Sequence, residues 1–437
     1  MSQQPASSPM LESLLEAPLP QGAAWLDVIR RENLDALAAH GLPDSRHEAW
    51  KYTALRGLAQ RRFHQGDALA LTREVDAGLL QLPGIDGPRL VFVNGAFRAD
   101  LSRLDDLPDG LEVLPLSRAL AQDDEPLRFA LSQRYRDVAD AFAQLNIAYA
   151  TDGVVLRVAA GARIDAPLQL SFLGAEAGEL AWHLRHVIAL GDGAQLSLVE
   201  HHAGLSNSPQ LVTSMADIVL GEGARLQMTV LQQAASEAAL VRRTGLQLGV
   251  AAHATMHVAE LGGGLVRHDL YGELKGDGAR LDTRGVFALR GRQHVDTQLA
   301  LRHDALATAS ESLWRGVADQ RARGVFRGAI VVAEGADGSD ASLSNKNLLL
   351  SAQAEIDTKP ELEIYADEVK AAHGATVGQL DERALFYLRS RGIALAQART
   401  LLTAAFCRAV LADIPHEPLR DHISDLLLAQ LPADVSA

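Results

Sequence analysis

The sequence predicts a mainly β protein, in which a right-handed parallel β-helix is flanked by two helical regions. Two observations carry this prediction. From about residue 146, short runs alternate apolar and polar residues, as half-buried strands do. A glycine turn recurs among them, and its steps from Gly191 to Gly221, Gly249 and Gly276 are 30, 28 and 27 residues. Repeats of short strands and glycine turns are typical of a solenoid, whose units must stack to bury their apolar faces.

The period also limits what each repeat contains. It is too short for a strand–helix–strand unit and lacks helical patterning, so we expect a coil of about three strands. A β-sandwich with coincidental glycine turns is the alternative. We assign residues 146–377 to the solenoid.

Residues 1–145 are expected to form a mostly helical N-terminal region. Apolar residues recur at helical spacing from Ala24 to His40, and Gly41 and Pro43 end that helix. A short strand at 90–93 runs into Asn94 and Gly95, which are typical turn residues.

Residues 378–437 are expected to form a small helical bundle. Asp381 is a candidate N-cap and Gly392 a candidate C′ residue of its first helix. A second helix is expected at about 395–411 and a third after Pro418. About sixty residues bury little surface by themselves, so this bundle must pack against the solenoid or a partner.

Composition excludes several classes of function. The 437 residues carry a net charge of −14, which argues against binding nucleic acid or an anionic membrane. The N-terminus lacks the pattern of a signal peptide, and no apolar run reaches the roughly 18 residues of a spanning helix, so we expect a cytoplasmic protein. The sequence also lacks a Walker-type phosphate loop, which argues against ATP hydrolysis by this chain.

The chain has one cysteine, Cys407. A stable iron–sulfur cluster usually needs about four thiolates, so this chain alone is expected to bind none stably. Cys407 lies in an apolar helix and is interpreted as a packing residue, with a reactive thiol beside Arg408 as the alternative. The histidines scattered through the solenoid are interpreted as polar residues of a strand face, with a metal site as the alternative.

Residues 361–369 are predicted to form a strand with one acidic face. Its polar positions are Glu361, Glu363, Tyr365 and Asp367, which alternate with apolar residues. Such charges either protect an edge from unwanted pairing or face a partner strand. His373 follows in a loop of small residues, and with Glu363 and Asp367 it could hold iron or another divalent ion.

The same stretch carries a resemblance to a known family. Residues 344–393, which begin SNKNLLLSAQAEIDTKPELEIYADEVKAAHGATVG, closely resemble the SufB/SufD family of iron–sulfur cluster assembly scaffolds. The segments RGVADQRARGVFRGAIVV (315–332), EAWKYT (48–53) and FVNG (92–95) agree with it. The helical N-terminal region and short length are more similar to the SufD members than to SufB.

The resemblance implies a fold and a set of partners. SufD-like proteins have a right-handed parallel β-helix between helical regions, and they pair with SufB through the end of that β-helix. Their C-terminal helices bind the ATPase SufC, and the complex receives sulfur from SufS with SufE to build a nascent cluster. The resemblance therefore implies a non-catalytic scaffold subunit rather than an enzyme.

The resemblance also implies site residues. His373, in VKAAHGATVG, matches the family's functional histidine and becomes the candidate ligand of the nascent cluster at the SufB interface. Many SufD sequences have a cysteine where this chain has Ala371. The acidic strand is assigned to face SufB. The residues assigned to SufC docking are Leu385, Leu388, Leu401 and Phe406.

Two alternatives remain at the level of sequence. One is a β-helix carbohydrate-active enzyme, although acidic residues in 146–330 do not repeat on one strand register and aromatic residues are only 5% of the chain. The other is a homodimer of the isolated chain through the same strand edge.

Overall fold

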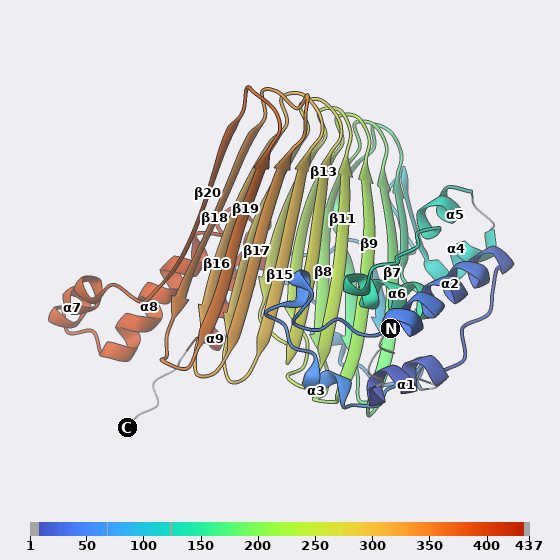
Figure 1. Cartoon of the computed structure of the whole chain (residues 1–437), viewed down its shortest axis with the longest axis horizontal. Helices are drawn as coiled ribbons and strands as arrows, with labels where there is room; N and C mark the ends of the chain where they lie inside the picture. The colour runs from blue at the N-terminus through green and yellow to red at the C-terminus, as the bar shows by residue number, and fades with distance from the viewer. Residues whose placement is uncertain (1–7, 68, 123–124, 432–437) are drawn as a thin grey trace.

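A computed structural model describes residues 8–67, 69–122 and 125–431. The predicted parallel β-helix with helical regions at both ends is confirmed: two long parallel sheets stack into a solenoid of about seven turns (Figure 1). The first sheet consists, in spatial order, of β19 (Glu355–Ile364), β17 (Arg323–Val332), β15 (His294–His303), β13 (Leu265–Leu274), β11 (Ala239–Leu248), β9 (Gln210–Leu220), β7 (Leu180–Leu190), β5 (Val154–Val158) and β4 (Leu111–Pro115), with β1 (His64–Gln65) beside β7.

The second sheet faces the first across the apolar core. It consists, in spatial order, of β20 (Lys370–Gly378), β18 (Asp340–Leu349), β16 (Ala309–Ala318), β14 (Arg280–Leu289), β12 (His253–Glu260), β10 (Arg225–Gln233), β8 (Gln195–Gly204), β6 (Arg163–Gly174), β2 (Arg89–Val93) and β3 (Ala96–Phe97). From β5 to β20, successive strands alternate between the two sheets, so each coil contributes one strand to each sheet.

The expectation of three strands per coil is wrong. From β6 to β20 the strands are long, with lengths from 8 residues in β12 to 12 in β6. One such strand from each sheet, with the two corners that join them, uses up the whole period. The repeat itself is in register, because Leu190, Leu220, Leu248 and Leu274 are neighbours across four successive strands.

Each of these leucines ends a strand, and a glycine lies in the corner that follows it, because the corners of successive coils lie close together. A Cβ on Gly276 would lie 2.0 Å from the backbone nitrogen of Val250, and one on Gly221 would lie 2.9 Å from the backbone nitrogen of Asp192. Any side chain there would separate adjacent coils. The spacing of the glycines in the sequence is therefore the spacing of the coils.

The N-terminal region combines helices with the strands that end the two sheets. Its helices are α1 (Pro9–Glu16), α2 (Ala24–His40), α3 (Arg56–Ala59), α4 (Leu116–Ala119), α5 (Glu125–Leu131) and α6 (Ala141–Tyr149), with short 3-10 helices η1 (Glu48–Trp50), η2 (Ala77–Leu80), η3 (Leu120–Gln122) and η4 (Val138–Asp140). The bounds predicted for α2 are confirmed. At the expected turn, Asn94 and Gly95 have φ of 47° and 83° and join β2 to β3.

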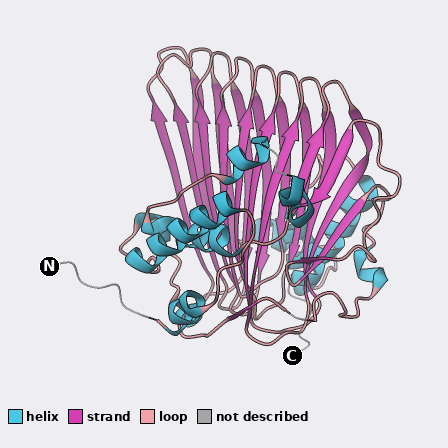
Figure 2. Ribbon diagram, turned by 90° about the vertical axis from the view of Figure 1, so that its right-hand side faces the viewer, coloured by secondary structure: helices cyan, strands magenta, loops and turns pink. Residues whose placement is uncertain are grey.

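Helices cover the outer faces of both sheets (Figures 1 and 2). α1, α2 and α6 pack on the first sheet against Leu211 and Val241. α8 (Leu395–Arg408) and α9 (Glu417–Gln430) pack on the second sheet, where Cys407 and Ile423 lie in one apolar cluster with Val286. Cys407 is fully buried, and burial raises the pKa of its thiol to about 12, which agrees with the packing interpretation.

Candidate functional site

The two ends of the solenoid differ. At the N-terminal end, the antiparallel strands β3 and β4 close the second and first sheets. At the other end the sheets stop at β19 and β20, and within the described residues no further strand pairs with their outer edges. Unpaired N–H and C=O groups in such an edge are available to another strand. The open end is therefore a candidate docking edge for a second chain.

The acidic stretch lies at this open end, but the strand is shorter than predicted. β19 ends at Ile364, and Tyr365 and Asp367 lie in the corner that leads to β20. The corner must stack on the one before it: the Tyr365 N–H donates to Val332 O (2.9 Å) and the Asp367 N–H to Asp337 Oδ1 (3.2 Å). Alternation continues through this corner in the sequence, so the pattern alone did not reveal where the strand ends.

The acidic side chains of β19 have partners within the chain. Glu361 accepts a hydrogen bond from Arg327 Nε (2.7 Å) and pairs with Lys359 Nζ (2.7 Å) on the outer face of the sheet. Glu363 accepts a hydrogen bond from the exposed Tyr365 hydroxyl (3.0 Å). Of the four predicted polar positions, Glu363, Tyr365 and Asp367 remain exposed and accessible to a partner.

His373 lies in β20 rather than in a loop, and its position is unusual. In the parallel register it is the neighbour of Leu343, a buried residue of the solenoid interior, and Ala371 is the neighbour of buried Ala341. Because side chains alternate along a strand, His373 and Ala371 continue two interior columns. Because the coil stops there, Ala371 is only half-buried and His373 is exposed. The imidazole thus belongs to the inner face of the solenoid at its open end.

Within the described residues, no group of three or more His, Cys, Asp or Glu side chains is arranged to hold a metal ion. Glu363, Asp367 and His373 therefore do not form such a group. Any metal or cluster bound through His373 would need further ligands from elsewhere.

The other histidines of the solenoid are not displayed on an exposed face, which corrects that interpretation. Those that are buried are His183, His186, His201, His202, His257, His268 and His303. They are held by neighbours instead: for example, the Val154 N–H donates to His186 Nδ1 (3.2 Å), and His202 Nε2 lies 2.5 Å from Glu200 Oε1. Alternation predicted their strands, but not that His186 and His202 would point into the solenoid or that outward-facing His183 would be covered by α6.

The C-terminal bundle begins with a helix that buries none of its residues. α7 (Glu382–Ser390) starts at Asp381, which caps the Arg383 N–H as predicted, and Gly392 has the positive φ of 85° expected after its end. α7 packs against α8 and lies beyond the strands, at the left of Figure 1. It therefore presents side chains to solvent rather than to the core.

The predicted docking residues differ in exposure. Leu401 is 47% exposed, Leu385 and Leu388 are half-buried, and Phe406 is half-buried against the second sheet with the Arg315 guanidinium 5.5 Å from its ring centroid. The most exposed apolar side chains of the bundle were not assigned: Phe386 is 74% and Tyr387 57% exposed. The sequence signal for them was the pair of adjacent aromatic residues in a short helix.

The comparison with known families agrees with this architecture. Residues 172–406 match a family model described as the SufBD core domain of the SUF system for FeS cluster assembly, and residues 19–170 match the SufBD protein N-terminal region. The chain belongs to the SufBD family. The core match spans most of the solenoid together with α7 and most of α8, so the open end and the exposed helix both lie within it.

Individual relatives of the SufBD family extend over most of the chain. The iron–sulfur cluster assembly protein SufD of Escherichia coli is 32% identical over 414 residues, which cover 92% of each chain. A SufBD family protein of Synechocystis is 31% identical and covers 90% of this chain and 88% of its own length. SufD of Bacillus subtilis is 26% identical over 65% of each chain.

These findings give this SufBD protein a role in iron–sulfur cluster assembly within the SUF system. They do not favour the carbohydrate-active alternative. In the part of the chain that the structure covers, no helix is long and apolar enough to span a membrane.

Proposed function

We propose that this chain is a non-catalytic scaffold subunit that pairs with a SufB-type chain through the open end of its solenoid. The observation that carries the proposal is the difference between the two ends, since β3 and β4 close one while β19 and β20 leave the other unpaired. A long bare edge in a stable protein invites strand addition unless a partner covers it. Pairing there would add backbone hydrogen bonds and would cover the inner columns that end at Ala371 and His373.

In this proposal the nascent iron–sulfur cluster is cargo shared between two chains. The only cysteine of this chain is buried in α8 and its thiol stays protonated at neutral pH, so the thiolates must come from the partner. His373 would contribute one imidazole ligand from the inner face of β20, next to the pairing edge. The chain by itself would hold no cluster stably.

We also propose that α7 and the exposed side of α8 dock the ATPase SufC. The support is the exposed apolar surface of Phe386 and Tyr387 on α7, which lies beyond the strands, and of Leu401 on the adjoining α8. Leu385 and Leu388 lie half-buried behind this surface. The chain has no Walker-type loop, so ATP hydrolysis would belong to the docked protein.

The remaining partners follow from this assignment. Sulfur would reach the complex from SufS with SufE, and the work would take place in the reducing cytoplasm, consistent with a single unoxidised thiol. A homodimer through the same edge is the expected competing state when the SufB-type chain is missing.

The pairing is tested by substituting a residue that is exposed only in the isolated chain. Val377 lies in β20 and is 43% exposed, and Val219 lies in β9 far from the open end and is 47% exposed. We expect Val377→Asp to abolish copurification of the SufB-type chain and Val219→Asp to leave it intact. Equal recovery with both variants would refute pairing at this edge.

The ligand role is tested in the reconstituted complex. His373→Ala should leave the complex assembled but reduce the iron and sulfide recovered after anaerobic cluster formation, whereas His64→Ala, an exposed histidine on β1, should not. An unchanged cluster yield in the assembled His373→Ala complex would remove His373 from the proposal.

A further inference from the structure

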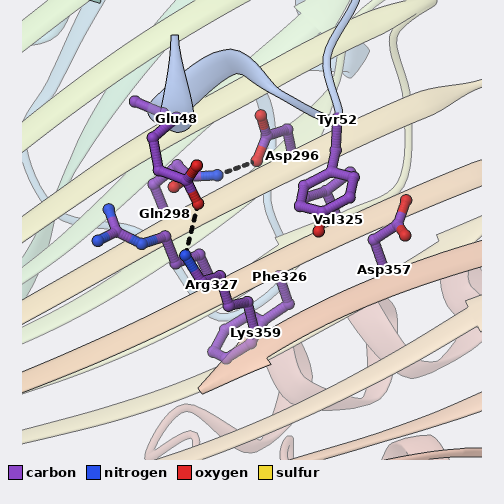
Figure 3. Close-up of a pocket in the computed structure, with 10 residues that line it drawn as sticks. Glu48, Tyr52, Asp296, Gln298, Val325, Phe326, Arg327, Asp357 and Lys359 are labelled. Carbon is purple, nitrogen blue, oxygen red and sulfur yellow. Dashed lines mark hydrogen bonds and ion pairs between the residues drawn. The ribbon is translucent and has the colours of Figure 1, made fainter. Parts of the chain in front are cut away.

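The segment EAWKYT, residues 48–53, has no role in the function proposed above, yet it crosses from the N-terminal region to the far end of the first sheet. We call it the strap. It begins with η1 and lies over the outer faces of β15, β17 and β19, where it lines a small cavity of about 10 Å³ with Asp296, Val325 and Lys359 (Figure 3). It therefore joins the start of the chain to the strand that ends the first sheet.

The middle of the strap is anchored in buried contacts. The Trp50 ring is buried, lies 4.0 Å from the Arg267 guanidinium carbon and donates from Nε1 to Ala139 O (3.0 Å). Arg267 Nη1 donates to Ala49 O (2.7 Å) and to Asp296 Oδ2 (2.6 Å). These contacts fix the strap on β13 and β15, two strands away from the open end.

The last residue of the strap, Thr53, is held on the first sheet by its side-chain hydroxyl. Thr53 is buried, and its Oγ1 donates to Asp296 Oδ2 (2.5 Å) and lies 3.0 Å from His294 Nε2. Burial lowers the pKa of His294 to about 4, so this imidazole is neutral at pH 7 and can donate Nε2–H to the hydroxyl. The strap thus ends in a satisfied hydrogen-bond network on β15.

At its other end, the strap is joined to β19, the last strand of the first sheet, by one ion pair. The Glu48 carboxylate lies 2.5 Å from Lys359 Nζ on β19 (Figure 3), and Lys359 also pairs with Glu361, which Arg327 of β17 holds. Tyr52 lies beside Val325 and Asp357 in the same view. The outer face of β19 is thereby tied to β17 and to the N-terminal region.

Among the described residues, nothing ties the outer face of β20 to a distant part of the chain in a comparable way. Most residues of β20 are exposed, whereas most of β19 is half-buried or buried. The hydrogen bonds and the ion pair that join the strap to the solenoid lead to the first sheet. The two strands that end the solenoid therefore differ: one is supported on its outer face by a distant part of the chain and the other is not.

We infer that the strap is a positioning element that holds β19 in place for strand pairing, whereas β20 is held by its pairing with β18. A preformed strand loses less conformational entropy on pairing than a frayed one, so support of β19 raises the affinity of the edge. The effect on affinity rests on the proposed function, but the support of β19 does not, because it concerns the isolated chain.

The test is amide hydrogen exchange of the full-length isolated chain, followed by mass spectrometry of peptides from 355–364 and 370–378. The variants are Glu48→Gln, which removes the exposed tie to Lys359, and Thr53→Val, which removes the buried tie to Asp296. The control is Glu273→Gln, which breaks an exposed ion pair with Lys275 on the same sheet away from the strap.

We expect 370–378, to which the strap makes no tie, to exchange at the same rate in every protein, and 355–364 to exchange more slowly than 370–378 in the wild type. Because an exposed ion pair contributes little, Glu48→Gln should speed exchange of 355–364 by about twofold. Thr53→Val should speed exchange of 355–364 by about fivefold or more, because the buried carboxylate of Asp296 loses the hydrogen bond that the Thr53 hydroxyl donates. The control should leave 355–364 unchanged.

The inference would be overturned if Glu48→Gln and Thr53→Val changed the exchange rate of 355–364 no more than Glu273→Gln does. It would also be overturned if the exchange rate of 370–378 changed as much as that of 355–364. Glu48→Gln is exposed and should fold normally, so a folding defect in Thr53→Val leaves the test intact. Affinity for the SufB-type chain is measured separately. If exchange responds as expected but no pairing occurs, the strap stands and the proposed function fails.

Discussion

Inside the solenoid, Arg242 Nη1 lies 3.2 Å from Glu260 Oε1, and both side chains are almost completely excluded from solvent. Glu200 Oε1 approaches the same guanidinium at 3.5 Å from its Nε and also lies 2.5 Å from His202 Nε2. Burial opposes ionisation of Glu200, but Arg242 and His202 outweigh it and hold its pKa below the usual range. Burial raises the pKa of Glu260, which Arg242 only partly opposes. One guanidinium thus neutralises one of two buried carboxyl groups.

The first prediction concerns the two buried carboxyl groups, Glu200 and Glu260, whose pKa values shift in opposite directions. Glu200→Gln should destabilise the protein by about 3–5 kcal/mol at pH 7, because Arg242 would lose its buried counter-charge. Glu260→Gln should change the free energy of unfolding by only about 1 kcal/mol, because an amide resembles a protonated carboxyl group in shape and hydrogen bonding. Urea denaturation of the two variants measures both values. Similar losses in both would mean that Glu260 is ionised.

The second prediction is the pH dependence of Glu260→Gln. A carboxyl group whose pKa is raised on folding lowers stability as pH rises above its unfolded value of 4.5, since the folded state keeps a proton that the unfolded state releases. The variant lacks this group, so its stability relative to the wild type should increase from about pH 4.5 upward. A difference that stays constant from pH 4.5 to 8 would contradict the prediction.

The third prediction concerns the buried histidines. Burial lowers the pKa of His186 to about 3 and of His303 to about 4, against 6.5 when exposed. Such groups stabilise the folded state above pH 6.5 and lose that contribution as pH falls, on the order of 3 kcal/mol for each full shift. Since domains are stable by about 5–15 kcal/mol, we expect unfolding between pH 6.5 and 4. His303→Gln should shift the acid midpoint downward, and the exposed-residue control His64→Gln should not.

The fourth prediction tests the packing of the interior. A Cβ on Gly285 would lie 2.1 Å from Trp314 Cε3, so Gly285→Ala must displace a fully buried indole. We expect a loss of about 1–3 kcal/mol in the free energy of unfolding. Gly374→Ala is the matched strand control, because its Cβ would meet no atom within 4 Å. Equal stabilities of the two variants would show that Trp314 can move at no cost.

The fifth prediction separates docking from stability in the C-terminal bundle. Phe386→Asp should abolish recovery of SufC without lowering the melting temperature, because Phe386 touches mainly solvent. Phe406→Asp should lower the melting temperature as well, because Phe406 packs against the apolar cluster beneath α8. Normal SufC recovery with a folded Phe386→Asp variant would rule out docking at this surface.

Much of the fold follows from patterns in the sequence. The glycine period predicted the coils, and the caps and breakers predicted α2 and α7, because each of these signals acts within a few residues of the chain. The number of strands per coil did not follow, since a period counts residues and does not show where the backbone bends. Residues 361–367 illustrate the difficulty: their alternation continues through a corner that only stacking on Val332 and Asp337 places.

In the candidate site, too, some features can be read from the sequence and others depend on the fold. The single cysteine and the histidine that follows an acidic stretch can be recognised without a structure, because they are matters of residue type and spacing. It is the fold that makes His373 face inward at an open end, buries Cys407 between α8 and the second sheet, and brings residues 48–53 to β19. These relations join positions up to 311 residues apart, and such distant pairs meet only through the stacking of the coils.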